Sequence, residues 1–244
     1  MFGMVTTAER PASETAMDRA EFDHFADEYE QQHARNIRIS GESPEYFARY
    51  KVQDVARMCE GRTPARILDF GAGVGASVPH WREAFPGASL TCIDVSARSL
   101  VIASKRHPGA AKYRVFDGAT LPFAAGSFDV AFAACVFHHI DVARQVPLLS
   151  ELRRVLTEDG RLFIFEHNPL NPLTRRAVNT CPFDQNAVLI SARSFRARAQ
   201  AAGFGQVRIA YRVFFPGPLR SLRATERWLE RVPLGAQYRL CASR

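Results

Sequence analysis

The chain has 244 residues, of which 47% are hydrophobic and 23% charged, so it can bury the core of one large domain. A net charge of +7 would suit a nucleic-acid partner, but all but three of the 32 basic residues are arginines scattered along the chain. This distribution favours a general preference for arginine over a phosphate-binding surface. No run of eighteen apolar residues occurs, so we expect no membrane-spanning helix.

Cysteine usage and the first residues bear on the compartment. The segment Met1 to Ala20 lacks the apolar run of a signal peptide. The cysteines are odd in number, widely spaced and never paired as C-x-x-C, which disfavours disulfides and a zinc site and favours a reducing cytoplasm. They are Cys59, Cys92, Cys135, Cys181 and Cys241.

Residues 1–60 are predicted to form an N-terminal leader and a helical cap, ahead of a larger domain over residues 61–244. The first nineteen residues are polar and poorly patterned. Apolar residues then recur at helical spacing from Arg19 to about His33. Ser43 and Pro44 suit the cap and first position of a second helix, which we expect to reach about Glu60.

The middle of the chain alternates between apolar runs and helical stretches, which predicts a parallel sheet covered on both faces. Asp159-Gly160 is expected to form the turn into the fifth strand, and residues 167–190 are read as a substrate-covering excursion. The predicted strands are Arg66–Phe70, Leu90–Ile93, Tyr113–Phe116, Val130–Ala134, Leu162–Phe165, Gln206–Phe215 and Gln237–Ala242. The predicted helices are Ser77–Phe85, Ser96–His107, Val142–Leu156, Ser191–Ala202 and an amphipathic Leu219–Arg231.

The strongest chemical signal is the glycine-rich turn that follows the first predicted strand, Ile67-Leu68-Asp69-Phe70-Gly71-Ala72-Gly73-Val74-Gly75. Glycines let a backbone turn tightly and approach a ligand at the carboxyl end of a strand. The spacing G-x-G-x-G departs from the G-x-G-x-x-G of dinucleotide-binding proteins, and no Gly-Lys-Ser/Thr of a phosphate-binding loop is present. An NAD-dependent reductase is therefore disfavoured.

Further signals follow in chain order. Asp94 ends the second strand, where a carboxylate can accept hydrogen bonds from both hydroxyls of a ribose. Asp117 ends the third strand, where a carboxylate can accept a hydrogen bond from an adenine amino group. His138-His139 have no acidic or cysteine partner at ligand spacing, so we expect no metal. The remaining segments of the series are Leu121-Pro122-Phe123, Ser127-Phe128-Asp129-Val130, Glu151–Leu156 and Arg161–Glu166.

In this order, from about Arg62 to Glu166, the segments resemble those of class I S-adenosylmethionine-dependent methyltransferases, particularly the ubiquinone/menaquinone-biosynthesis-type enzymes that act on small molecules. The resemblance implies an α/β fold: a Rossmann-like seven-stranded sheet, mostly parallel with its last strand antiparallel, with helices on both faces and an N-terminal helical cap. It also implies S-adenosyl-L-methionine as the methyl donor.

The resemblance further implies which residues hold the donor. The methionine portion would be held by Asp69, Gly71, Ala72, Gly73 and Gly75, and the ribose by Asp94 and Val95. The adenine would be held by Asp117, Gly118 and Ala119. The methionine portion and the reacting methyl group would be bordered by Ala134 and Cys135.

The acceptor side is predicted from the chemistry of methyl transfer. A general base is needed only if the acceptor keeps its proton at neutral pH. His139 is the candidate base because an unperturbed histidine, with a pKa of about 6.5, is largely neutral at pH 7. His138 and His167 are the alternatives. The predicted lining of the acceptor pocket is Tyr29, Tyr46, Phe47, Tyr50, His167 and Asn168.

Two other functions stay open at this stage. An RNA or protein methyltransferase would need a continuous basic surface around the pocket, and the Asn-Pro-Pro-Tyr type of sequence is absent after the fourth strand. A catalytically silent binding module is disfavoured by the intact glycines and the three carboxylates. A small-molecule acceptor, reacting through oxygen, nitrogen or carbon in a biosynthetic pathway, is therefore the leading hypothesis, and a homodimer is compatible with it.

Overall fold

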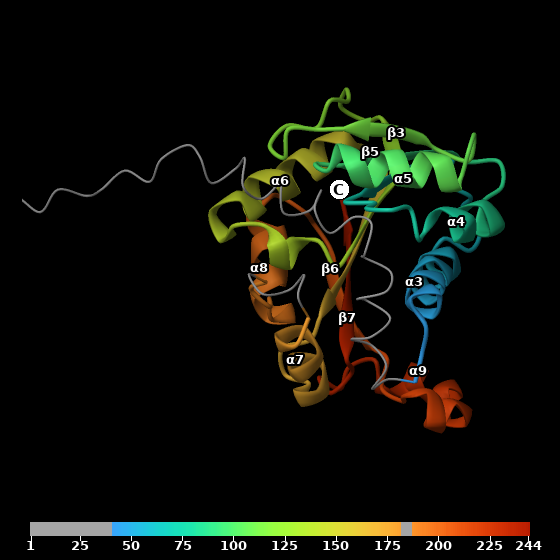
Figure 1. Ribbon diagram of the computed structural model, residues 1–244. Coiled ribbons are helices and arrows are strands. Elements are labelled where there is room, and N and C mark those ends of the chain that lie inside the picture. Colours follow the sequence, from blue (N-terminus) through green and yellow to red (C-terminus); the bar gives the residue numbers. More distant parts are fainter. Residues whose placement is uncertain (1–40, 182–186) are drawn as a thin grey trace, which may run out of the picture.

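The computed structural model describes residues 41–181 and 187–244. They form a seven-stranded sheet of order β3-β2-β1-β4-β5-β7-β6 with helices around it (Figure 1). Strand β7 runs antiparallel to β5 and β6, and the pairings among β1 to β5 are parallel. The predicted topology is thus confirmed. The strands are β1 Arg66–Phe70, β2 Ser89–Asp94, β3 Lys112–Val115, β4 Phe128–Ala134, β5 Leu156–His167, β6 Val207–Arg212 and β7 Gln237–Ser243.

Short polar caps start most of the helices between these strands. The side chains of Ser43, Ser96, Asn171 and Ser191 each accept a hydrogen bond from a backbone N–H of the first turn. The α-helices are α3 Pro44–Met58, α4 Val78–Ala84, α5 Ala97–Arg106, α6 Val142–Val155, α7 Pro172–Asn179, α8 Ala192–Ala201 and α9 Glu226–Leu229. Two 3₁₀ helices are η2 Phe137–His139 and η4 Gly217–Thr225.

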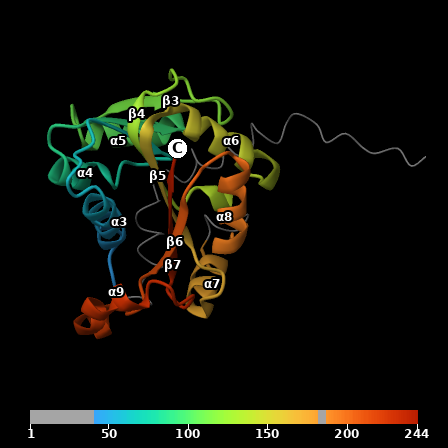
Figure 2. The same cartoon turned by 180° about the vertical axis from the view of Figure 1, so that it is seen from behind.

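The sheet is buried on both faces because alternate side chains of its central strands point into two different cores. In β1, Ile67 packs with α3 and α4, while Leu68 packs with α6 and α8 on the other face. Figure 2 shows the same layering from behind, with α3 and α4 on one side of the sheet and α6 and α8 on the other. The expectation of helices on both faces is confirmed.

Two predicted elements differ from the structure. Asp159-Gly160 lies within β5, because Leu156 already pairs with Phe128 before the register shifts and Arg161 pairs with Val130. The amphipathic segment Leu219–Arg231 does not form one continuous helix: most of it belongs to the 3₁₀ helix η4, which has non-helical backbone angles at Leu219, and the short α9 follows.

Other expectations fall outside what the structure tests. The predicted helix Arg19–His33, with Tyr29, lies outside the described residues, and the division into a cap over residues 1–60 and a domain over 61–244 stays a prediction. Within the described part of the chain, no helix combines the length and the apolar character needed to cross a membrane.

A buried ion-pair cluster fixes α3 to the C-terminal strands. Asp54 of α3 accepts from Arg239 of β7 at 2.5 Å and from Arg212 of β6 at 2.8 Å. Burial raises the pKa of the Asp54 carboxyl, but the two guanidinium groups outweigh this effect and hold the pKa below its ordinary value. The same helix carries Phe47 and Lys51, so this cluster positions two side chains of the cavity described next.

Candidate functional site

A cavity of about 910 Å³ opens at the carboxyl ends of β1, β2, β4 and β5. This is the edge at which open α/β sheets bind ligands. Its volume lies near the upper end of the roughly 300–1,000 Å³ typical of small-molecule sites, which is room for a large ligand or for two smaller ones. Among the predicted site residues, those in its lining are Phe47, Asp69, Gly71, Ala72, Gly73, Asp94, Val95, Asp117, Gly118, Ala134, Cys135, His138, His139 and His167.

The glycine turn after β1 is a tight backbone cradle. Gly71 has a φ of +71°, and a Cβ at this position would meet Cγ2 of Val136 at 2.5 Å. Gly73 has a φ of +52° with open space around the place of a Cβ. Gly75 is outside the lining; a Cβ there would meet Ala103 of α5 at 3.0 Å, so this glycine serves the packing of α5 instead of touching a ligand.

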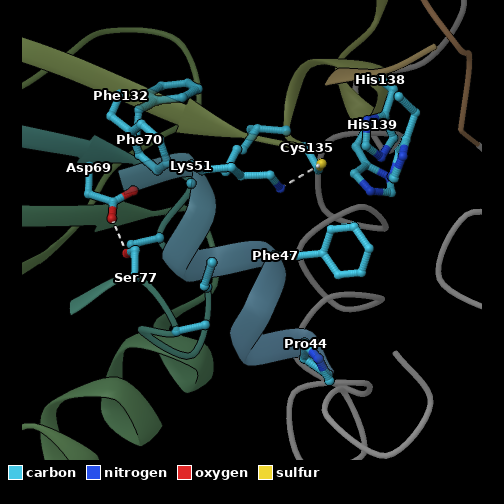
Figure 3. Close-up of a pocket in the computed structure, with 18 of the residues that line it drawn as sticks. Pro44, Phe47, Lys51, Asp69, Phe70, Ser77, Phe132, Cys135, His138 and His139 are labelled. Atoms are coloured by element: carbon cyan, nitrogen blue, oxygen red, sulfur yellow. Dashed lines mark hydrogen bonds between the residues drawn. The ribbon is translucent and has the colours of Figure 1, made fainter. Parts of the chain in front are cut away.

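The three predicted carboxylates lie at three successive strand ends but in different environments. Asp69 is buried and accepts hydrogen bonds from Ser77 and Trp81, and burial raises its pKa to about 6 (Figure 3). Asp94 accepts from the N–H of Gly73 at 2.8 Å, which ties the glycine turn to β2. Asp117 is exposed and accepts from the N–H of Ala119 at 2.7 Å, so Ala119 serves this turn outside the cavity lining.

Asp94 is half-buried in the cavity wall, where its carboxylate oxygens suit ribose hydroxyls. The Gly71–Gly73 turn leaves space for close approach of a ligand. His80 of α4 adds a buried Nε2 without a hydrogen-bond partner among the described residues, at the same cavity wall. These features fit the polar amino-acid and ribose groups of S-adenosylmethionine.

Cys135 follows β4 in an unusual setting. Its φ is +59°, which is rare for a residue with a Cβ. Nζ of Lys51, from α3, lies 3.3 Å from its Sγ (Figure 3). Burial raises the pKa of the thiol, but Lys51 and His167 more than offset this and lower the pKa from 9.0 to about 7. The sequence assigns no role of its own to Lys51, because it is one of several charged residues on a helix and only the fold brings it to the end of β4.

Three histidines gather beside Cys135: His138 and His139 lie on a turn that a buried glutamate holds, and His167 ends β5. Glu166, at the end of β5, accepts from the N–H groups of Val136 and Phe137 through Oε1 and contacts Nδ1 of His138 at 2.6 Å through Oε2. Burial raises the pKa of Glu166, but His138, His167 and the N–H of Phe137 together outweigh burial and the pKa is lowered. Glu166 is fully buried, so it positions the histidine turn instead of meeting a ligand directly.

The histidine rings are in mutual contact. The ring centroid of His138 lies 4.1 Å from that of His139 and 5.2 Å from that of His167. His138 is almost fully buried, whereas His139 is half-buried in the cavity wall. The structure therefore brings together all three base candidates.

Some residues predicted to line the acceptor pocket have other roles. The guanidinium carbon of Arg223 lies 4.5 Å from the centroid of the Tyr46 ring. The hydroxyl of Tyr50 donates a hydrogen bond to Oε1 of Gln237. Asn168 is buried and donates to backbone carbonyls near residue 235. These three side chains do not belong to the cavity lining. Tyr46 and Tyr50 join α3 to the C-terminal part of the chain, and Asn168 joins the chain after β5 to residues 233–235.

The end of the cavity away from the glycine turn is predominantly apolar. It lies between the start of α3, α7 and the chain that follows β6, which are distant in sequence. Its apolar lining includes Pro44, Phe47, Leu173, Ala177, Phe214 and Pro216. Leu173 and Ala177 lie within the predicted excursion over residues 167–190. Phe214 and Pro216 were not anticipated, since nothing in their local pattern distinguishes a cavity wall from an ordinary loop. The cavity thus has one polar end and one apolar end, with the Cys135–His139 turn between them.

Comparisons with known proteins show that the chain is similar to methyltransferases. A family model described as "Methyltransferase domain" matches residues 68–164. A malonyl-[acyl-carrier protein] O-methyltransferase of Geobacter sulfurreducens is 30% identical over 182 residues, which cover 67% of each chain. A demethylmenaquinone methyltransferase of Thermotoga maritima is 36% identical over 108 residues, or 44% of this chain and 46% of that one.

The fold is shared with solved structures. A methyltransferase of Thermotoga maritima that depends on S-adenosylmethionine superposes with a TM-score of 0.65 at 19% identity, covering 93% of this chain and 99% of that chain. A geranyl diphosphate C-methyltransferase of Streptomyces coelicolor, solved with S-adenosylhomocysteine, has a TM-score of 0.57 at 18% identity and 79% coverage of both chains.

Proposed function

Because the chain belongs to the S-adenosylmethionine-dependent methyltransferases, we propose that it methylates a small organic molecule that binds in the apolar end of the cavity. One observation carries this proposal: a single cavity joins the glycine turn and carboxylates at one end to apolar walls at the other, with the histidine turn between them. A donor and a small acceptor can then meet at the turn between the ends. The names of the relatives, a malonyl-[acyl-carrier protein] O-methyltransferase and a demethylmenaquinone methyltransferase, support an acceptor from biosynthesis.

The residues at the polar end suit the donor. The glycine turn and Lys51 face the end where the amino-acid portion fits, Asp94 suits the ribose and Asp117 with Gly118 suits the adenine. When bound, the donor supplies a methyl group on an electrophilic sulfonium. The protein then has to hold the acceptor in line with the bond that breaks, and such positioning can contribute on the order of 7–11 kcal/mol to lowering the barrier.

Proton removal is assigned to the histidine turn. His139 faces the cavity and is half-buried, which suits a base that must contact the acceptor. Glu166 and His138 form the buried pair that orients the turn. The step needs this base only when the acceptor is a phenol, an amine or an acidic C–H; a carboxylate acceptor has already lost its proton at neutral pH.

The apolar walls bear on the class of acceptor. Phe47, Leu173 and Phe214 offer aromatic and aliphatic surface, and the few polar groups nearby suit a ring or chain with one reacting heteroatom or carbon. Oxygen, nitrogen and carbon acceptors are all compatible with this arrangement. Methylation of RNA or protein is the second candidate, and it would require binding that falls steeply as salt increases.

The test is a screen of quinone precursors, phenols, acyl carboxylates and amines, read out as formation of S-adenosylhomocysteine. Turnover of one of these classes supports the proposal. Calorimetry with S-adenosylmethionine separates the other outcomes: binding without turnover of any acceptor supports the silent module, and salt-sensitive turnover of RNA or protein supports the second candidate.

Once an acceptor is found, His139→Ala and His139→Gln test the base. Both variants should lower kcat by roughly 10²–10⁴-fold and leave the Kd for S-adenosylmethionine unchanged, if the acceptor keeps its proton at neutral pH. Near-full turnover by His139→Ala on such an acceptor would move the assignment to His138 or His167.

A further inference from the structure

Exposed apolar side chains are concentrated at one end of the molecule. Of the eleven large hydrophobic residues that are exposed in the described part of the chain, seven lie in two segments, around α7 and from η4 to residue 234. Both views show α7 and α9 at the same end, opposite α5 and β3 (Figures 1 and 2). We call these seven residues the docking face: Leu170, Leu173, Leu219, Leu222, Trp228, Val232 and Leu234.

The two segments of the docking face are joined. Nδ2 of Asn171 donates to the carbonyl of Leu234 at 2.8 Å, and Oγ1 of Thr174 donates to the carbonyl of Ala236 at 2.9 Å. Trp228 is 68% exposed and carries the guanidinium of Arg227 over its ring at 4.6 Å. An exposed tryptophan among leucines is costly in water and needs an explanation.

The charge of the docking face is mostly positive, because its acidic side chains are bound by other groups of the same chain. Glu226 accepts from the N–H groups of Phe214 and Phe215, and Glu230 pairs with Arg212 at 2.8 Å. The arginines on this face project outward, and none of them has an ion pair among residues 41–181 and 187–244. They are Arg175, Arg176, Arg220, Arg227 and Arg231.

The docking face also borders the apolar end of the cavity. Leu173 is 55% exposed and lines the cavity as well, and Pro216, directly before η4, is another lining residue. A surface held against this end would therefore lie at the cavity entrance, and an apolar molecule leaving that surface would reach the histidine turn without crossing bulk water.

We propose that the docking face binds an anionic lipid surface. Short amphipathic segments that combine Trp and Leu with Arg lie in the plane of a membrane interface, where the apolar side chains enter the headgroup boundary and the cations meet anionic lipids. The indole ring suits this boundary because one part is apolar and the N–H is polar. We assign a lipid surface instead of a protein because the exposed leucines and Trp228 are interspersed with exposed arginines along short helical segments, which is the pattern of a segment that lies in a membrane interface. The proposal does not depend on which acceptor is methylated.

The experiment measures partition of the full chain onto vesicles of phosphatidylcholine alone and of equal parts phosphatidylcholine and phosphatidylglycerol. The chain has two tryptophans, and Trp81 is fully buried, so a change in fluorescence reports Trp228. Anionic vesicles should shift the emission to shorter wavelength, and added salt should reduce binding. Each arginine near the surface contributes roughly a fivefold gain in partition, so Arg220→Gln with Arg231→Gln should reduce partition by about 25-fold.

A matched control has the same change of charge at the opposite end of the molecule. Lys105→Gln with Lys112→Gln alters two exposed cations on α5 and β3 and should leave partition nearly unchanged. Trp228→Ala should bind more weakly and show no emission shift on vesicles. Absence of binding to anionic vesicles at low salt overturns the proposal, as does an equal loss in both double variants. Binding with no change in Trp228 emission also overturns it, because the apolar face would then not enter the lipid.

Discussion

Replacing Lys51 by methionine tests whether α3 controls the chemistry of the polar end of the cavity. Methionine keeps most of the length of the side chain and its apolar stem, so packing in α3 should survive. What is lost is the ammonium group 3.3 Å from Sγ of Cys135. Since Lys51 and His167 offset the burial of this thiol, loss of the ammonium should raise the pKa of Cys135 from about 7 toward its ordinary 9.0.

The size of the effect on reactivity follows from two opposing factors. At pH 7, a thiol with a pKa of about 7 is about half thiolate, and one with a pKa of about 9 is about 1% thiolate, a loss of roughly 50-fold. A more basic thiolate is also more nucleophilic, by roughly 6- to 10-fold over two pKa units. The alkylation rate at pH 7 should therefore fall by roughly five- to eightfold in Lys51→Met.

The assay follows alkylation of Cys135 by iodoacetamide across pH 5.5 to 9.5, with mass spectrometry to assign the site. Reactivity of the unmodified chain should rise with pH and reach half its plateau near pH 7. The other four cysteines are buried, so labelling should be confined to Cys135. S-adenosylhomocysteine should protect the thiol, because Cys135 lines the cavity.

Two results would refute the reasoning. One is a midpoint for Cys135 above pH 8.5 in the unmodified chain, which would mean that the Lys51 contact does not offset burial. The other is an equal fall in rate for Lys105→Met, a change on an exposed residue of α5, since the effect would then come from net charge and not from the contact.

Three further changes have defined outcomes. Asp54→Ala leaves the buried guanidinium of Arg239 without its partner and should reduce the free energy of unfolding by about 3–5 kcal/mol in urea titrations. Gly71→Ala adds a methyl group at a φ of +71°, 2.5 Å from Val136. It should reduce the free energy of unfolding by about 1–3 kcal/mol and weaken the binding of S-adenosylmethionine measured by calorimetry. Glu166→Gln keeps the shape but removes the charge beside His138; it should lower kcat more than it changes the Kd for the donor, and shift the pH–rate profile.

Each of these has an outcome that would contradict it. A loss below about 1 kcal/mol for Asp54→Ala would mean that the cluster is solvated. Unchanged donor affinity in Gly71→Ala would place the donor away from the glycine turn. For Glu166→Gln, an unaltered pH–rate profile would limit this residue to holding the backbone of the histidine turn.

The sheet was predictable because its signals are local. Each central strand is an apolar run of the right length, and the glycine turn, Asp94 and Asp117 follow strand ends that a parallel sheet must place at one edge. The roles of Tyr46 and Asn168 were not predictable in the same way. Their partners, Arg223 and the carbonyl of Gly235, lie far away in the sequence, and a residue type alone does not tell whether a side chain faces a cavity or a neighbouring segment.

The least predictable feature is also the one that joins the two ends of the site. The turn after β4 depends on three distant residues: Gly71 leaves room for Val136, Lys51 contacts Cys135, and Glu166 binds the backbone at its centre. No spacing of residues in the sequence indicates any of these three contacts. Because one side of this turn borders the end of the cavity proposed for the donor and the other carries the histidines, a change that displaces the turn, such as Gly71→Ala, should disturb donor binding and acceptor chemistry together. A substitution in the apolar wall, such as one at Phe214, should alter the acceptor alone.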